Sequence, residues 1–97
     1  SSIPSEFSIK QNFPNPFNPV TTIVFSVPKR SAIKLNVYNS IGSIVAELAA
    51  GIAGPGNYKI DWDASNFPSG VYFYKIVTDS YSESRKMVLV FQMKINT

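Results

Sequence analysis

Histidine and cysteine are both absent from the 97 residues of this chain. Without histidine the chain has no imidazole to serve as a general base, and it cannot by itself supply a serine–histidine–aspartate triad. Without cysteine it lacks a disulfide framework and the usual ligands of zinc. No apolar run approaches the roughly 20 residues that span a membrane, and no basic-then-apolar signal peptide opens the chain. Catalysis, cofactors and membrane insertion are therefore not expected.

Charged side chains are few and scattered. Nine Lys and Arg against six Asp and Glu give a net charge of +3, and only Lys29-Arg30 and Arg85-Lys86 are adjacent basic pairs. A nucleic-acid-binding face normally gathers its basic side chains into one stripe. Glycoside hydrolysis needs two carboxyl groups flanking a cleft, which so small and acid-poor a domain does not offer. Neither a nucleic-acid partner nor enzyme activity is predicted.

Alternation of apolar and polar residues is the main pattern that the chain does contain. Seven segments between the prolines and glycines are predicted to be β-strands: residues 6–10, 20–28, 32–39, 43–50, 57–63, 71–78 and 85–91. The alternation is clearest in 20–28, 32–39 and 57–63, whereas 43–50 has a short helix as its alternative. Their spacing predicts an all-β, antiparallel β-sandwich. A chain of 97 residues is the size of one domain, so residues 1–97 are predicted to form a single sandwich.

The alternation also predicts which side chains form the core. The expected inward faces are Ile23, Phe25 and Val27; Ile33, Leu35 and Val37; Ile44, Ala46 and Leu48; Tyr58, Ile60 and Trp62; and Met87, Leu89 and Phe91. Residues 71–78 are apolar on both faces, which predicts a central strand covered on both sides.

Two hairpin turns are indicated. Asn39-Ser40-Ile41-Gly42-Ser43 has a glycine late in a short loop, which suits a type I turn followed by a left-handed Gly42 in a bulge. Thr78-Asp79-Ser80-Tyr81 is a tight polar connection and predicts a second hairpin.

A proline-rich stretch, Gln11–Pro19, precedes the first long strand. Its prolines exclude regular strand and helix. Phe13 and Phe17 within it have two interpretations: they plug one end of the sandwich, or they form an exposed aromatic epitope. The plug is favoured because aromatic side chains held between prolines usually pack inward.

Five motifs in register resemble the C-terminal sorting domains of type IX secretion substrates. They are a PNPFNP loop followed by TTIVFSVP, a VYNSIG hairpin, the strand GNYKIDWD, the segment SGVYFY, and a closing SRKMVLV. The resemblance covers roughly Phe7 to Val90. The family's most characteristic positions correspond here to Pro14, Asn15, Pro16, Phe17, Asn18 and Pro19 in the loop, and to Gly42, Trp62, Asp63, Gly70 and Tyr72 as structural positions. An immunoglobulin-like module of flagellar hook-capping proteins is similar between the WD and SGVY motifs.

The resemblance implies an immunoglobulin-like sandwich at the C-terminus of a larger exported protein. It implies a non-catalytic address label that an outer-membrane translocon of Gram-negative bacteria reads in the periplasm. A sortase-like peptidase then usually removes the domain, and the upstream cargo is released or attached to the cell surface. Sorting information in the family lies in the last strand, here Arg85, Lys86, Met87, Val88, Leu89 and Val90. We expect the basic pair to be exposed and the strand edge to be open to strand addition by a partner.

Two departures from the family pattern are present. The chain continues beyond the last motif through Gln92 to Thr97, and the hairpin Asp79-Ser80-Tyr81 lacks the glycine that family members often have there.

Other functions stay open at this stage. Asp61, Asp63 and the oxygen-rich turn after them could hold calcium weakly, although a wet strand face followed by an Asx-type turn explains them better. An exposed stripe of Tyr38, Tyr72, Tyr74 and Tyr81 would favour a carbohydrate- or surface-binding module. A structural spacer is the third possibility.

Overall fold

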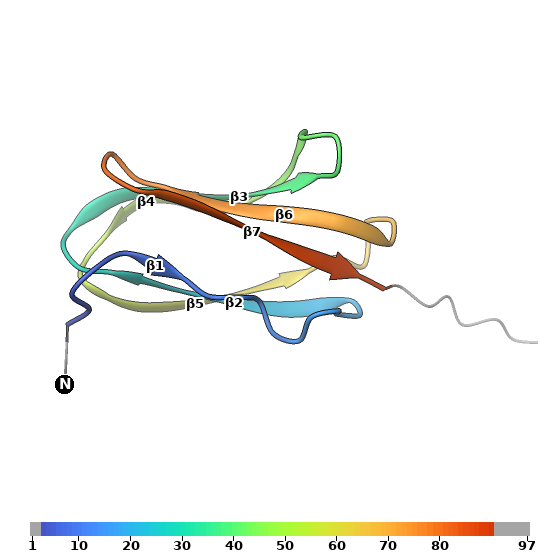
Figure 1. Ribbon diagram of the computed structural model, residues 1–97, viewed down its shortest axis with the longest axis horizontal. Helices are drawn as coiled ribbons and strands as arrows, with labels where there is room; N and C mark the ends of the chain where they lie inside the picture. The colour runs from blue at the N-terminus through green and yellow to red at the C-terminus, as the bar shows by residue number, and fades with distance from the viewer. Residues whose placement is uncertain (1–2, 91–97) are drawn as a thin grey trace, which may run out of the picture.

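The computed structural model describes residues 3–90, which form seven strands and no helix. The strands are β1 (Ser8–Ile9), β2 (Val20–Val27), β3 (Ser31–Asn39), β4 (Ile44–Ala53), β5 (Gly56–Asp63), β6 (Gly70–Val77) and β7 (Ser82–Leu89). All strand pairs are antiparallel. They build a three-stranded sheet in the order β1-β2-β5 and a four-stranded sheet in the order β4-β3-β6-β7. The two sheets are stacked as layers (Figure 1), so the predicted all-β sandwich is confirmed. None of the described residues belongs to a helix that could cross a membrane.

The core lies between the sheets and follows the predicted alternation in most strands. Inward side chains of β2 and β3 are fully or almost fully buried, as are Met87 and Leu89 of β7. Phe91, which was predicted to continue that face, lies outside the described residues. Trp62 of β5 is buried, while Tyr58 and Ile60 of the same face are half-buried and pack against the core. The prediction of these faces is therefore confirmed.

The inward face predicted for β4 is wrong at Ile44, whose side chain is 58% exposed. The pairing of β3 with β4 shifts register twice, between Leu35 and Asn36 and between Val37 and Tyr38. A bulge adds one residue to a strand and so reverses the phase of its alternation. As a result, sequence neighbours in β4 are both partly buried, first Val45 and Ala46 and then Leu48 and Ala49.

The prediction that residues 71–78 are covered on both faces is also wrong. Strand β6 does lie between β3 and β7 within its sheet. Its inward side chains Tyr72, Tyr74 and Ile76 are buried, but Val71 on the other face is 37% exposed. The apolar outer face of this sheet is therefore open to solvent.

Both predicted hairpins are present. In the first, the Gly42 amide donates to the Asn39 carbonyl at 3.0 Å, and the Asn39 amide donates to the Ser43 carbonyl at 2.9 Å. Gly42 has a φ of 88°, as a left-handed glycine in a bulge requires. In the second, the Thr78 amide donates to the Tyr81 carbonyl at 2.7 Å.

Substitution at Gly42 tests this turn. A Cβ added there would meet no atom within 4 Å, so the cost of replacement is conformational and not steric. We expect Gly42→Val to unfold more easily than Gly42→Asn, by about 1 kcal/mol or more, because Asn tolerates positive φ and β-branched residues do not. Chemical denaturation of the two variants measures the difference, and equal midpoints would contradict the turn assignment.

Trp62 offers a test of the core. Trp62→Ala should lower the free energy of unfolding by about 3–5 kcal/mol, the range for large aromatic truncations, whereas Trp62→Phe should retain part of that stability. Thermal or urea unfolding checks both. A Trp62→Ala variant that melts within a few degrees of wild type would contradict a core position.

Candidate functional site

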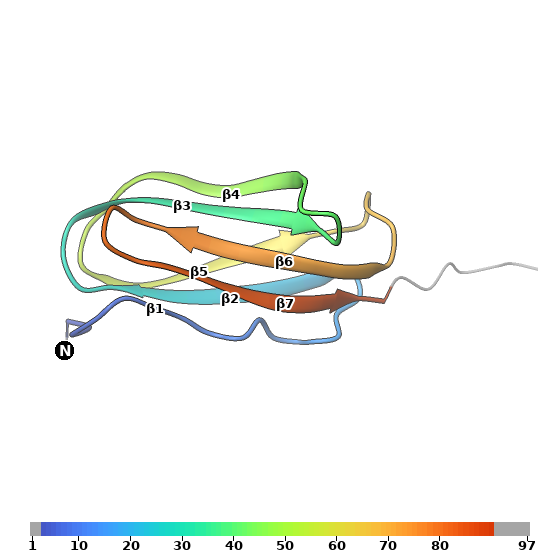
Figure 2. The ribbon, with the colours of Figure 1, turned by 45° about the horizontal axis from the view of Figure 1, so that its top comes forward.

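The proline-rich stretch and the last strand lie against each other. Figure 2 shows the chain between β1 and β2 running alongside β7. The peptide bonds that precede Pro14, Pro16 and Pro19 are cis. Between the prolines, Phe17 forms an isolated parallel bridge with Leu89. Its amide donates to the Val88 carbonyl and its carbonyl accepts from the Val90 amide, both at 2.9 Å.

Two side chains of the same stretch extend this pairing. The Asn15 Oδ1 atom accepts from the Val88 amide at 3.0 Å, and the Gln11 Nε2 atom donates to the Lys86 carbonyl at 2.7 Å. Together with Phe17, they cover the outer edge of β7 from Lys86 to Val90. The expectation of an open terminal edge is therefore wrong in this half of the strand. Prolines cannot complete a ladder because they lack an N–H group, but the residues between them supply both donors and acceptors.

The two phenylalanines of the stretch have opposite positions. Phe17 is 1% exposed and belongs to the core, whereas Phe13 is 79% exposed. Phe13 bridges Thr22, so it lies on the outer side of the three-stranded sheet. The plug interpretation is right for Phe17 and wrong for Phe13.

Trp62 is the centre of an aromatic cluster that joins distant motifs. Its ring centroid lies 5.9 Å from that of Phe17, 5.4 Å from that of Phe67 and 5.7 Å from that of Tyr72. These rings come from the PNPFNP loop, the turn after β5 and the start of β6. Sequence reasoning missed Phe67, although it is an aromatic residue next to a proline, as Phe17 is.

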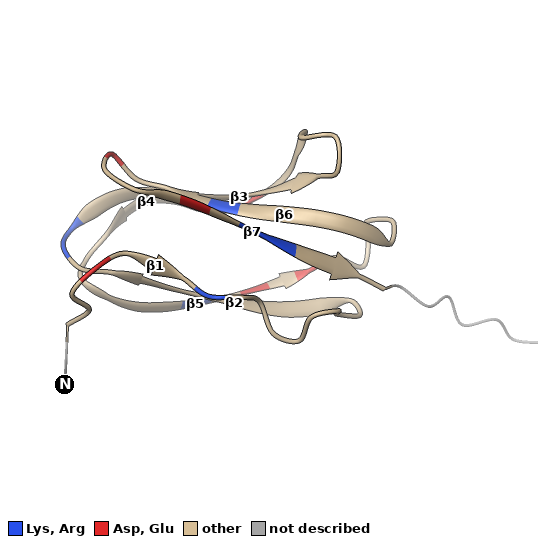
Figure 3. Cartoon of the chain, viewed as in Figure 1, with Lys and Arg blue, Asp and Glu red and all other residues tan. Residues whose placement is uncertain are grey.

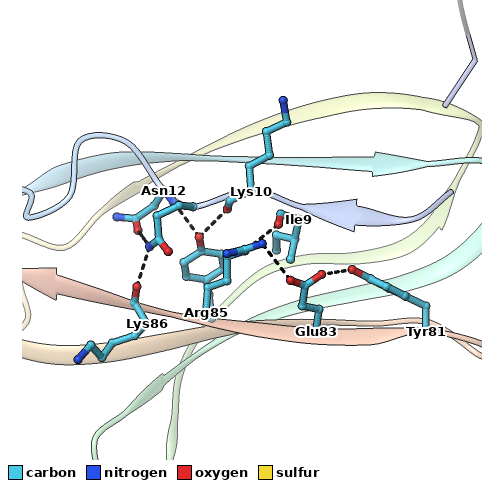
Figure 4. Close-up of polar contacts among 9 residues, drawn as sticks. Ile9, Lys10, Asn12, Tyr81, Glu83, Arg85 and Lys86 are labelled. Atoms are coloured by element: carbon cyan, nitrogen blue, oxygen red, sulfur yellow. Dashed lines mark hydrogen bonds and ion pairs between the residues drawn. The ribbon is translucent and has the colours of Figure 1, made fainter. Parts of the chain in front are cut away.

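The adjacent basic residues of β7 face opposite sides. Arg85 is half-buried on the inner side, where its Nε atom donates to the Ile9 carbonyl at 2.8 Å (Figure 4). Its guanidinium also forms a 3.0 Å ion pair with Glu83. Lys86 is exposed on the outer side. The expectation that both are exposed is therefore wrong for Arg85, because neighbouring residues of a strand point to opposite faces.

The polar chain continues toward the hairpin that precedes β7. The Tyr81 hydroxyl donates to the Glu83 carboxylate, and the Tyr81 ring stacks on Phe7 at a centroid distance of 5.3 Å. Burial, reinforced by this contact with Glu83, raises the pKa of Tyr81 to about 12. These contacts fix the segment Phe7–Ile9 of the three-stranded sheet to β7 of the other.

Tyr74 makes a second connection between the sheets that the sequence did not reveal. Its hydroxyl donates to the Lys10 carbonyl at 2.6 Å and accepts from the Asn12 amide at 2.7 Å. Burial raises the pKa of Tyr74, and its side chain is fully enclosed. The tyrosine hydroxyl thus satisfies two backbone groups at the point where the chain leaves β1 for the proline-rich stretch.

The tyrosine stripe considered for carbohydrate binding is not on the surface. Tyr72 and Tyr74 are buried, and Tyr81 is half-buried against Phe7. The Tyr72 hydroxyl donates to the Pro68 carbonyl at 2.6 Å, which completes an enclosed position. Tyr38 alone of the four lies on an outer face, where it is half-buried.

The Asx-type turn after β5 is confirmed. The Asp63 Oδ1 atom accepts from the Ser65 amide at 3.0 Å and from the Ser65 hydroxyl at 2.6 Å, and these bonds lower the pKa of Asp63. Asp61 accepts from the Thr22 hydroxyl at 2.6 Å. Among residues 3–90 there is no group of three or more acidic or imidazole side chains placed to hold a metal ion. Figure 3 shows Lys and Arg distributed over both sheets and the connections between them.

Residues 11–90 match the family model described as the secretion system C-terminal sorting domain. The chain belongs to this family. The family consists of sorting signals for type IX secretion that are generally non-catalytic, and such a signal directs export to the cell surface or the extracellular space. The matched range contains both the proline-rich stretch and β7.

One solved structure supports the fold of the sorting domain. Dimeric latent PorU from Porphyromonas gingivalis is similar to it with a TM-score of 0.66 and 19% sequence identity. The similarity covers 84% of the sorting domain and 9% of the PorU chain. The sorting domain therefore spans about a tenth of that chain. No curated protein matches it in sequence.

The different environments of Arg85 and Lys86 predict different stabilities on replacement. Arg85→Met keeps the aliphatic stem but removes a charge-assisted hydrogen bond and a partly exposed ion pair, so it should lower the free energy of unfolding by about 1–2 kcal/mol. Lys86→Met is the matched control and should change it by less than about 0.5 kcal/mol. Urea unfolding measures both values. Equal losses would contradict the role of Arg85 in joining the sheets.

Proposed function

We propose that residues 1–97 form a single sorting domain that directs a larger upstream cargo protein across the outer membrane. In this proposal an outer-membrane translocon recognises the folded domain in the periplasm. A sortase-like peptidase then removes it, and the cargo is released or attached to the cell surface. The domain itself carries out no chemistry and needs no cofactor.

The observation that carries this proposal is the contact between two of the segments that are characteristic of the family. Gln11, Asn15 and Phe17 form four hydrogen bonds with the backbone of residues 86–90. The terminal segment Arg85–Val90 is therefore presented by a folded unit and not as a free tail. A signal of this kind depends on the whole domain being folded.

Within this unit the two basic residues have separate roles. Arg85 holds the Ile9 backbone and so positions the segment that leads into the proline-rich stretch. Lys86 is exposed and offers its charge to a partner. Recognition by strand addition along Lys86–Val90 would first require Asn15 and Phe17 to leave Val88. These two residues occupy the amide and carbonyl groups of Val88 with which an added strand would pair.

Fusion to a reporter tests the sorting function. Residues 1–97 at the C-terminus of a periplasmic reporter should direct it to the cell surface or medium of a type IX-competent host, and the reporter without the domain should stay in the periplasm. Lys86→Ala should reduce export, whereas Lys59→Ala, an exposed lysine on the other sheet, should not. Deletion of Lys94–Thr97, which lies outside the described residues, should leave export intact if the extension only follows the signal.

If the fusion with the folded wild-type domain remains in the periplasm to the same extent as the reporter alone, the domain is not a sufficient sorting signal. A spacer role would then fit better.

A further inference from the structure

A row of side chains crosses the outer face of the four-stranded sheet. Tyr38 lies directly opposite Ile44 on one side and Phe73 on the other, and Phe73 lies opposite Lys86. Directly opposite residues of adjacent strands share one face. In the neighbouring row Val71 lies opposite Val88. We call these residues the outer patch: Ile44, Tyr38, Phe73, Val71 and Val88, with Lys86 at its rim.

The outer patch is apolar but faces solvent. Ile44 and Val71 are exposed, and Tyr38, Phe73 and Val88 are only half-buried. The patch draws residues from β3, β4, β6 and β7, so it exists only in the folded sheet. A contiguous apolar surface of this kind, with aromatic side chains at its centre, is typical of a protein–protein contact.

The charges around the patch are mostly of one sign. Lys34, Lys75 and Lys86 lie on the same face of the sheet. Glu47, opposite Asn36, is the one acidic residue at a strand position of this face within the described range. A partner that fits the face therefore carries acidic groups around an apolar centre. A symmetric contact between two copies would instead bring lysines of the two faces together.

Because the edge of β7 is covered, the outer face of the four-stranded sheet is where a partner can reach this strand. Backbone groups from Lys86 to Val90 are engaged by the proline-rich stretch, and the inward side chains Met87 and Leu89 are buried. From Lys86 to Leu89, the side chains that β7 offers to a partner without rearrangement are those of Lys86 and Val88. These two side chains are continuous with Phe73 and Val71 of β6.

We propose that the outer patch is the docking surface for a protein of the export machinery, whose complementary surface is apolar and rimmed by carboxylates. This inference rests on the proposed sorting function. It extends the recognised surface beyond the terminal strand to β3, β4 and β6, so recognition depends on residues about 40 positions away in sequence from Lys86, as well as on Arg85–Val90.

The test uses substitutions outside β7. Ile44→Ser combined with Phe73→Ser removes apolar surface from the patch, and Lys34→Glu combined with Lys75→Glu reverses charge beside it. The matched controls lie on the outer side of the other sheet: Val20→Ser with Val24→Ser, and Lys10→Glu with Lys59→Glu. All four double variants are fused to the periplasmic reporter in the full-length domain, and their melting temperatures are measured on the purified domains.

We expect export to fall about tenfold or more for both patch variants, as loss of a central contact predicts, and to change less than about twofold for both controls. If the serine pair on the patch lowers the melting temperature by more than a few degrees, the lysine reversal decides the result, because it leaves the apolar packing in place. Photocrosslinking from position 73 during export should then identify a partner peptide rich in Asp and Glu.

The other outcomes contradict the docking proposal, and they separate a failure of the outer patch from a failure of the sorting function. Normal export of folded patch variants, while the wild-type fusion is exported, rejects the patch but leaves the sorting function standing. Failure of the wild-type fusion itself rejects both. Sedimentation that shows self-association of the purified domain, lost in the Ile44→Ser/Phe73→Ser variant, assigns the patch to a second copy instead.

Discussion

The outer edge of β7 is the constraint on which the rest of this structure depends. An edge strand has a row of amide and carbonyl groups that need partners, and buried or half-buried groups without them are costly. The chain meets this need with its own N-terminal part. To do so, the segment after β1 first pairs with β2 of the three-stranded sheet through Phe13 and then with β7 of the other sheet through Phe17. Tyr74 and Arg85 bind the backbone of Lys10 and Ile9 just before that segment, and Glu83 pairs with Arg85.

Much of the fold could be predicted from local pattern. Strands β2, β3 and β5 alternate without interruption, and their inward faces follow directly from the sequence. Gly42 has its left-handed conformation because the hairpin that contains it is short, which is also a local property. Trp62 was identifiable as a core residue because its face is shared with Tyr58 and Ile60.

The errors arise where distant pairing decides the outcome. The bulges of β4 are set by its register against β3, and nothing near Ile44 in the sequence announces them. Val71 is apolar, yet whether an apolar face is covered depends on what packs on the sheet and not on the strand itself. The motifs indicated which segments characterise the candidate site, but not that Phe17 would bind the backbone of Val88 and Val90. The opposite orientations of Arg85 and Lys86 could have been predicted from strand alternation. The two residues were instead treated as one exposed basic pair.

The contact between Gln11 and Lys86 spans 75 positions of the chain. Contacts of such long sequence separation carry a large closure entropy and do not form from a local nucleus. A ribosome has to synthesise Lys86 to Val90 before the proline-rich stretch can find its partner, so a prematurely terminated chain lacks the completed unit. The early proline-rich stretch and the late strand β7 therefore complete one folded unit only after both have been synthesised.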